Sequence, residues 1–358
     1  MRIAGHLTLK STLITGALWT LLFSGLASAQ QAPHVVDSVR LGSGLYEVVY
    51  SDTGKAVFVT AGGSKGSSEG GHVFRLDPET LKVINDITMP ERTFGIGLND
   101  KTQTLYTTNT IAGSLSVLDL DSGKVIKTLM LTDVAKARAA GEKPIQPRQI
   151  VVDESSDTVY VSGVAQEGVI WVIDGRDNSL KQTIENVGTM TTGLALDTRH
   201  ERLYATNMGA NEIAVIDTGS GKVIERFEAG GEKPINIAVD ADTQRLFVAN
   251  MGSNNVSVID ARSGKLIRTV SAGQGALGIT FDPSSKRIYV ANRGAGTVSV
   301  IDATSYEMLA TLETGTHPNT VAIDPATQRV YVTNKAARPK EGESAQDDNG
   351  DTVTLIAP

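Results

Sequence analysis

Three short patterns in this sequence have spacings that could support chemistry. Residues 62–66 and 66–70 both match Gly-x-Ser-x-Gly, the motif of a hydrolase nucleophile, and the Asp-x-Asn-x-Asp run at 347–351 resembles the start of a calcium loop. The serine motif requires a strand-to-helix turn and a partner histidine, whereas these serines lie in a glycine- and serine-rich stretch. Position twelve of the calcium pattern is Pro358 instead of a bidentate glutamate. We therefore expect no nucleophile here, and a solvated acidic loop at residues 347–351.

Cysteine and histidine usage excludes further classes of site. The 358 residues contain no cysteine, which excludes disulfides, cysteine-ligated zinc, iron–sulfur clusters and thiol nucleophiles. The histidines after residue 30 do not have the spacing of helical or hairpin metal ligands. They are His34, His72, His200 and His317. We predict no catalytic residue, no metal site and no cofactor.

Arg148 is the main candidate for binding chemistry. Pro147 fixes its own φ and favours an extended Gln146, so the chain should enter the following segment in one defined direction. A guanidinium offers five donors in a fixed geometry and can hold a carboxylate or phosphate in a bidentate manner. Tyr46 and Phe94 would add aromatic faces beside it. The elements that would position these side chains follow from the repeats in the chain.

A short strand pattern recurs seven times. The copies read VFVTAG, LYTTNT, VYVSGV, LYATNM, LFVANM, IYVANR and VYVTNK, and their ring residues lie 42 to 54 residues apart. A repeat of this length with four short strands is typical of a propeller blade. The composition agrees, because 36 glycines, 11 prolines and 5% aromatic residues favour many tight turns between Val- and Ile-rich strands.

The fifth copy shows one blade. It reads INIAVD, RLFVAN, NVSVID and KLIRTV, with turns between them. The first three segments are apolar, as stacked sheets require, and the more polar fourth should form the outer rim. We predict an all-β, seven-bladed β-propeller of four-stranded antiparallel blades.

The two chain ends predict how the ring closes. The seventh copy supplies three strands within residues 319–357 and then stops, whereas residues 35–41 form a fourth-strand pattern that lacks a blade of its own. We expect the N-terminal strand to complete the seventh blade and to leave no long bare edge. Residues 30–358 would then be a single propeller domain.

The repeats also resemble a known family. The YVTN and VSVIDA elements, with LYEVVY, QPRQIVVD, IWVIDG, TGLALD and THPNTVAID, are similar to the periplasmic YncE-type YVTN-repeat propellers. The likeness covers residues 35–358, although VFVTAG and VYVSGV lack the asparagine that ends the second strand. The resemblance implies ligand or partner binding, with single-stranded DNA binding proposed for some relatives, and it supplies no catalytic set.

The long loops lie on one predicted face. Loops after second and fourth strands emerge on the same face of an antiparallel blade, and the insertions at 61–71, 132–147 and 335–351 all belong to these classes. The other face has only tight turns, in which eleven aspartates should accept backbone N–H bonds. Binding residues tend to lie on variable loops of a rigid scaffold, so we expect a binding face here, although tolerated drift in loop length is an alternative.

The start of each innermost strand should surround the central channel on this loop face. These residues can bind a small anion or a nucleobase, or else the asparagines cap turns and the aromatic side chains plug the channel. The predicted ring is Tyr46, Phe94, Arg148, Thr192, Asn236, Leu277 and Asn319, with Arg293 and His317 on adjoining loops.

Net charge limits the class of partner. Without Arg2 and Lys10 the chain has 31 basic and 40 acidic residues, a balance that disfavours nonspecific nucleic-acid binding. The turn aspartates would place much of the acidity on the opposite face. A locally positive loop face could be built from Arg92, Lys143, Arg148, Lys233 and Arg293.

Three functions compete on these observations. The first is a non-enzymatic, monomeric binding protein whose loop face and channel mouth receive a small anionic ligand or a protein partner. The second is single-stranded DNA binding, with bases stacked on Phe94 or Tyr46. The third is a metal-dependent lactonase-like hydrolase, for which Glu47, Asn236 and Asn319 are the nearest set, although Glu47 should alternate away from the mouth.

The N-terminal segment predicts the cellular address. Arg2 and Lys10 precede an apolar run at residues 13–26, and Ala27-Ser28-Ala29 fits a signal peptidase site. We expect residues 1–29 to be a cleaved signal peptide, the mature chain to carry no membrane span, and the protein to be periplasmic.

Overall fold

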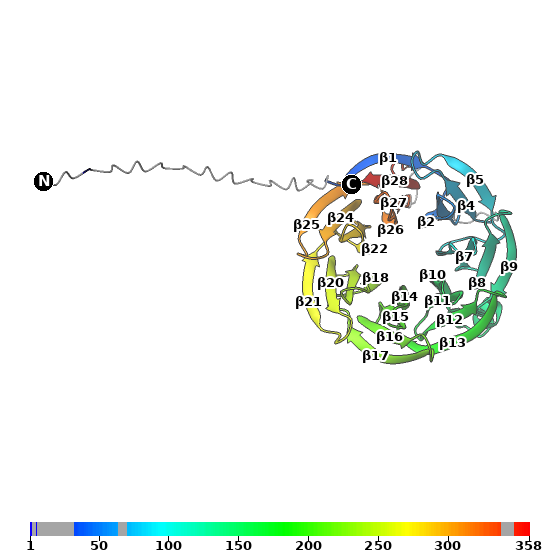
Figure 1. Ribbon diagram of the computed structural model, residues 1–358. Coiled ribbons are helices and arrows are strands. Elements are labelled where there is room, and N and C mark those ends of the chain that lie inside the picture. Colours follow the sequence, from blue (N-terminus) through cyan, green and yellow to red (C-terminus); the bar gives the residue numbers. More distant parts are fainter. Residues whose placement is uncertain (2–4, 6–31, 64–69, 338–346) are drawn as a thin grey trace. The chain divides into compact units, whose positions relative to one another are not determined.

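The computed structural model describes residues 1, 5, 32–63, 70–337 and 347–358. Ala32–Pro358 form one compact unit. The compact unit contains seven four-stranded antiparallel sheets around a central channel, which confirms the predicted β-propeller (Figure 1). Among the described residues, no helix has the length and apolar character needed to cross a membrane.

The innermost strands line the channel and the second strands pack behind them. The innermost strands are β2 (Leu45–Ser51), β6 (Ile96–Asn99), β10 (Gln146–Asp153), β14 (Thr191–Asp197), β18 (Pro234–Asp240), β22 (Ala276–Asp282) and β26 (Pro318–Asp324). The second strands are β3 (Ala56–Ala61), β7 (Thr104–Asn109), β11 (Thr158–Val164), β15 (Arg202–Asn207), β19 (Arg245–Asn250), β23 (Arg287–Asn292) and β27 (Arg329–Asn334).

The third strands are buried and the outer strands form the rim. The third strands are β4 (His72–Leu76), β8 (Ser114–Asp119), β12 (Gly168–Asp174), β16 (Glu212–Asp217), β20 (Asn255–Asp260), β24 (Thr297–Asp302) and β28 (Thr352–Ala357). The outer strands are β5 (Val83–Thr88), β9 (Lys124–Met130), β13 (Ser179–Gly188), β17 (Lys222–Glu228), β21 (Leu266–Ser271), β25 (Met308–Glu313) and β1 (His34–Arg40). Most outer-strand residues are exposed, as the polar fourth segments predict.

The ring closes with strands from both chain ends. β1 pairs antiparallel with β28, with His34 opposite Ala357 and Arg40 opposite Thr352, so the N-terminal strand completes the seventh blade as predicted. In Figure 1, β1 lies along the rim outside β28, between β25 and β5. Leu41 then donates its N–H to the Asp351 carbonyl, which extends the closure into the loop that leads to β2.

The hydrophobic core lies between neighbouring blades. Tyr106 of the second blade packs with Val161 and Trp171 of the third blade, and all three side chains are nearly fully buried. This contact confirms that Trp171 packs between blades. Apolar side chains on both faces of each sheet thus bind seven thin sheets into one body.

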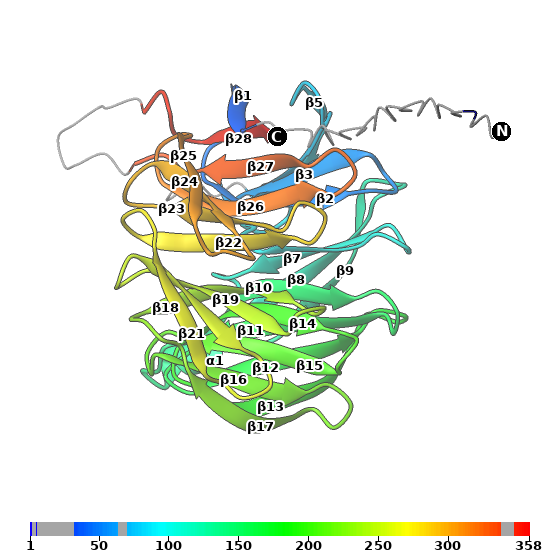
Figure 2. The ribbon, with the colours of Figure 1, turned by 60° about the vertical axis from the view of Figure 1, so that its left-hand side comes forward.

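The loop face contains one helix that the sequence did not predict. Residues expected to form a plain loop include α1 (Val134–Ala139), whose first turn begins when Asp133 accepts a hydrogen bond from the Lys136 N–H. An aspartate at this position is a common helix cap. The helix projects from one face of the disc (Figure 2).

The turn aspartates have their predicted role. Each of the eleven accepts at least one backbone N–H within its own turn; Asp217 accepts the Ser220 N–H at 2.8 Å, and Asp302 accepts those of Thr304 and Ser305. Hydrogen bonds from the Ser122 and Ser220 hydroxyls, followed by those from the N–H groups of the same serines, hold the pKa values of Asp119 and Asp217 below the usual range for an aspartate. The full set is Asp77, Asp119, Asp153, Asp174, Asp197, Asp217, Asp240, Asp260, Asp282, Asp302 and Asp324.

Candidate functional site

Six of the innermost strands have a β-bulge near the loop face. In β10 the pairing register with β11 shifts between Pro147 and Ile150, and comparable shifts occur in β2, β14, β18, β22 and β26. A bulge places an extra residue in one strand and re-aims its side chain. The side chains at these bulges line one cavity of about 280 Å³, which we call the channel mouth. They are Tyr46, Arg148, Thr192, Ile235, Leu277 and Asn319.

The position of Asn236 corrects the predicted ring. Each mouth residue lies five positions before the residue that ends its strand, and in β18 that position is Ile235. Asn236 is one residue further on, is buried, and donates its Nδ2–H to the Leu277 carbonyl at 2.9 Å. Proline precedes the mouth residue at 147, 234 and 318, so aligning these prolines would have identified Ile235.

In most mouth residues the backbone carbonyl accepts a hydrogen bond from a serine or threonine hydroxyl of the preceding blade, a contact that we call a clasp. The Thr108 Oγ1 accepts the Gly95 N–H at 2.8 Å and donates to the Arg148 carbonyl at 2.8 Å, which links the second and third blades. The serine or threonine before the last residue of the YVTN-type segment has this role. The other clasps to a mouth carbonyl are Ser162 to Thr192, Thr206 to Ile235 and Thr333 to Tyr46, at 2.8 to 3.0 Å. Blade five has Ala249 at this position, and Asn236 provides the inter-blade bond instead.

Arg148 lines the mouth and carries one buried donor without a partner. Its backbone is held by Thr108, and the preceding Pro147 carbonyl accepts a hydrogen bond from Thr110 at 2.7 Å. The side chain is half-buried, and its Nη1 is a buried atom without a hydrogen-bond partner. A buried donor without an acceptor costs about 1–3 kcal/mol.

Arg293, Asn319 and Tyr46 form the opposite part of the mouth. The Arg293 Nη1 donates to Asn319 Oδ1 at 2.7 Å, and the Asn319 Nδ2 donates to the Tyr46 carbonyl at 2.7 Å. The Lys335 Nζ lies 4.4 Å from the centre of the Tyr46 ring. Lys335 begins the 335–351 insertion that the sequence places on the loop face, but its contact with Tyr46 was not predicted. Thr192 also lines the mouth, as predicted.

Phe94 and His317 lie beside the mouth cavity. Phe94 packs edge-on against Tyr46, with ring centres 5.2 Å apart, and the Arg92 guanidinium lies 5.9 Å from the Phe94 ring centre. His317 lines a neighbouring cavity of about 460 Å³ with Lys233, and Arg293 lines both cavities. The described loop face therefore carries several cations around the mouth.

Glu47 lies one layer below the mouth. Its side chain is 6% exposed, and its Oε2 accepts the Ile96 N–H of the second blade at 3.1 Å. Burial raises the pKa of Glu47 to about 7, against the opposing effect of the Arg148 charge. As predicted, Glu47 is not among the residues that line the mouth. Glu47 and Asn236 of the lactonase-like set each bond to the neighbouring blade.

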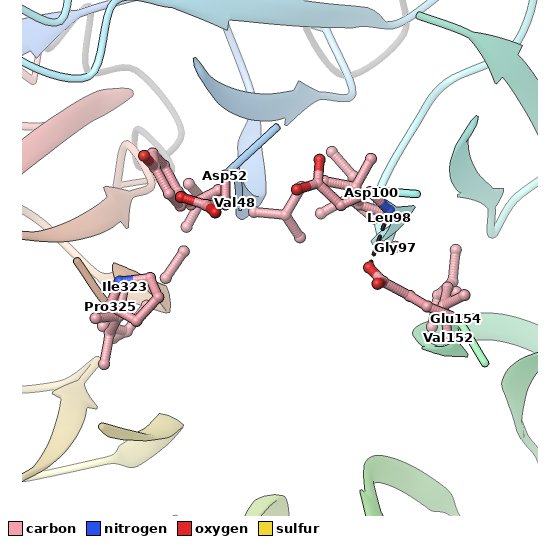
Figure 3. Close-up of a pocket in the computed structure, with 15 residues that line it drawn as sticks. Val48, Asp52, Gly97, Leu98, Asp100, Val152, Glu154, Ile323 and Pro325 are labelled. Atoms are coloured by element: carbon pink, nitrogen blue, oxygen red, sulfur yellow. Dashed lines mark hydrogen bonds between the residues drawn. The ribbon is translucent and has the colours of Figure 1, made fainter. Parts of the chain in front are cut away.

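The opposite end of the channel is acidic. A cavity of about 390 Å³ there is lined by Val48, Leu98 and Val152, with Asp52, Asp100 and Glu154 at its edge (Figure 3). These carboxylates serve local structure. Asp100 accepts the Thr53 N–H and Glu154 accepts the Asp100 N–H, at 2.8 and 2.9 Å. Among the described residues, no three His, Asp or Glu side chains are placed to hold a metal ion.

The acidic run at 347–351 is not the solvated loop that its sequence suggested. Asp351 is 8% exposed, and its Oδ1 accepts the N–H groups of Gly44, Leu45 and Ala336. Asp347 accepts the Thr316 hydroxyl at 2.8 Å. These oxygens bind N–H and O–H donors, which fits neither the calcium pattern nor a free loop. The serine patterns at 62–70 lie largely outside the described residues.

Comparison with known proteins identifies the family. The model of the YNCE-like β-propeller family matches residues 145–342, more than half of the chain. The uncharacterized protein YncE of Escherichia coli strain K12 is 38% identical over 225 residues, and that of Salmonella typhi is 39% identical over the same length. Each match covers 63% of this chain and 60% of the relative, so it spans less than two thirds of these relatives. The chain belongs to the YNCE-like β-propeller family.

Proposed function

We propose that the protein is a non-enzymatic binding protein whose channel mouth receives a small anionic ligand. The observation that carries the proposal is the Arg148 Nη1, a buried donor without a partner at a cavity of about 280 Å³. A carboxylate, sulfate or phosphate oxygen is the natural acceptor for a guanidinium. Arg293 lines the same cavity, and Leu277 and Ile235 give it apolar walls, a combination common in small-molecule sites.

The charge around the mouth supports an anion over a cation. Lys335 lies over the Tyr46 ring, and Lys233 lines the adjoining cavity. Glu47 lies one layer below the mouth, and burial favours its neutral form. Most of the turn aspartates lie at the other ends of the strands. The net negative charge of the chain therefore does not imply that the loop face is negatively charged.

A thermal-shift screen of the protein without its first 29 residues tests this function. We expect a small dianion such as sulfate or succinate to raise the unfolding midpoint, because a ligand that binds only the folded state stabilises it by mass action. Sugars, divalent metals and a neutral diol serve as comparisons. If no anion shifts the midpoint, or if an Arg148→Lys variant shows the same shift, the mouth is not an anion site.

Single-stranded DNA is the second candidate, and the basic residues around Tyr46 and Phe94 favour it. Base stacking needs an open ring face, and Lys335 and Arg92 already lie over these two rings. Adding short oligonucleotides to the same screen separates the two functions. A shift with an oligonucleotide that free phosphate and sulfate do not reproduce would favour DNA.

The proposed address is the periplasm. The support is the pattern of residues 1–29, with basic residues, an apolar run and Ala27-Ser28-Ala29. We expect the chain to be recovered from the periplasmic fraction of a bacterial host with a new N-terminus near Gln30. Recovery in the cytoplasm with Met1 intact would refute export.

A further inference from the structure

Glu47 occupies a ring of equivalent positions one layer below the channel mouth. The members lie four positions before the residue that ends each innermost strand, and Glu47 is the only acid or base among them. They are Glu47, Gly95, Gln149, Gly193, Asn236, Gly278 and Thr320. An ionisable side chain at this level therefore differs from the pattern of the other six blades.

Gln149 shows that the bond made by Glu47 does not require a charge. The Gln149 Oε1 accepts the Leu194 N–H at 2.7 Å, and Leu194 of β14 is the equivalent of Ile96 in β6. A neutral amide thus makes the same inter-blade contact that the Glu47 carboxyl makes. An ionised carboxylate in this buried position costs more than the amide would, so the structural role alone does not account for a glutamate.

The charged surroundings of Glu47 point to the mouth. The neighbouring elements present neutral groups: Thr60 of β3 and Ile96 of β6 bond to Glu47 itself, and Asn319 and Thr320 of β26 bond to the adjacent Tyr46 carbonyl. The ionised group that acts on Glu47 is Arg148, whose Nη1 has no hydrogen-bond partner. Two further cations at the mouth have other contacts, because Lys335 lies over Tyr46 and Arg293 donates to Asn319.

We propose that Glu47 couples anion binding at the mouth to the uptake of a proton. This inference rests on the proposed function. Without ligand, the Arg148 charge favours an ionised Glu47. An anion on Arg148 cancels that charge, so a proton from solvent moves onto the Glu47 carboxylate and the buried site stays free of a second negative charge.

The coupling predicts the class of ligand that binds well and the pH dependence of its affinity. A pKa near 7 means that Glu47 is partly ionised at neutral pH, so affinity should rise as the pH falls from about 8.5 through this value and should level off at lower pH. The favoured ligand class is a small anion that stays fully ionised under those conditions, such as a carboxylate, sulfate or sulfonate. If the bound anion raises the pKa by about one unit, affinity should fall about tenfold between pH 6 and pH 8.5.

Isothermal titration with sodium sulfate tests the coupling, because sulfate does not change its charge over this range. Titrations at pH 7 in Tris and in Bis-Tris, two cationic buffers with different ionisation enthalpies, report the protons taken up on binding. We expect a fraction of a proton per sulfate for the wild-type protein and none for Glu47→Gln. The variant should also bind at pH 8.5 as tightly as the wild type binds at pH 6.

Glu154→Gln is the matched control, because it neutralises an acid at the opposite end of the channel and keeps an oxygen for the Asp100 N–H. It should take up protons as the wild type does. Sulfate binding without proton uptake by the wild type, or the same uptake by Glu47→Gln, would overturn the coupling and leave the anion site intact. No sulfate binding by either protein would overturn the sulfate-type anion site itself, and the coupling with it.

Discussion

The Thr108 hydroxyl donates a 2.8 Å hydrogen bond to the Arg148 carbonyl and so joins the second blade to the residue on which the candidate site depends. The same oxygen accepts the Gly95 N–H, so one side chain holds both the residue before β6 in its own blade and the mouth residue of the next blade. The YVTN-type repeat therefore builds the scaffold and also fixes the direction in which the mouth side chains leave the backbone.

Thr108→Val should destabilise the protein by about 1–3 kcal/mol, because it leaves the buried Gly95 N–H and the Arg148 carbonyl without this partner. Denaturant unfolding measures the change. Thr107→Val is the control at the neighbouring position, since the Thr107 hydroxyl is buried and makes no hydrogen bond; it should be neutral or slightly stabilising. Equal effects of the two substitutions would contradict the clasp.

Removal of residues 30–40 should lower the melting temperature strongly. The truncation takes away β1 and leaves β28 as an exposed, apolar edge. A chain that starts at Ala32 serves as the control and should melt like the protein that starts at Gln30. A truncated protein with an unchanged melting temperature and no tendency to associate would show that β1 does not close the ring.

Asp351→Ala should cost about 1–3 kcal/mol of stability, since three buried or half-buried N–H groups lose their acceptor. Asp351→Asn keeps an oxygen and should recover part of the loss. Asp348→Ala is the control, because that side chain is 83% exposed. Deletion of residues 344–350 should also destabilise the fold, because it removes Asp347, which accepts the Thr316 hydroxyl and the Ala337 N–H, whereas the acidic, aperiodic sequence alone predicts no effect. Chemical denaturation of the four variants decides between these expectations.

The pH dependence of stability should show two opposite contributions. The pKa of Glu47 is raised from 4.5 to about 7 in the folded protein, so the folded state binds more protons than the unfolded state, and stability falls as pH rises through this window. Aspartates such as Asp217 have lowered pKa values, and their contribution is lost as pH falls through those lowered values. Glu47→Gln should therefore stabilise the protein at pH 8, by about 3 kcal/mol at most, and change little at pH 4. Unfolding curves at the two pH values provide the measurement.

Most of the fold could be predicted from the repeats in the sequence. Seven copies of one strand pattern, with a fourth-strand pattern at residues 35–41, were sufficient to predict the blades and the closure that β1 and β28 form. The turn aspartates were predictable for the same reason, because an Asx turn depends only on neighbouring residues.

The site was less predictable than the fold. Asn236 was placed in the ring although Ile235 is at the mouth, an error of one position that alignment of Pro234 with Pro147 and Pro318 corrects. Asp351 was assigned to a solvated loop because its partners Gly44 and Leu45 lie about 300 positions away in sequence. Lys335 was missed because its contact with Tyr46 also joins the two ends of the chain.

Sulfate titration of an Arg148→Lys variant is the most direct test of the account. The lysine keeps one positive charge and removes the planar set of donors, including the Nη1 that has no partner. We expect sulfate affinity to fall by roughly 1.5–3 kcal/mol, about ten- to a hundredfold, with little change in the ligand-free melting temperature. Arg138→Lys, on the exposed helix α1, should bind as the wild type does. An Arg148→Lys protein that binds sulfate with wild-type affinity, or that melts far lower without ligand, would show that Arg148 belongs to the scaffold.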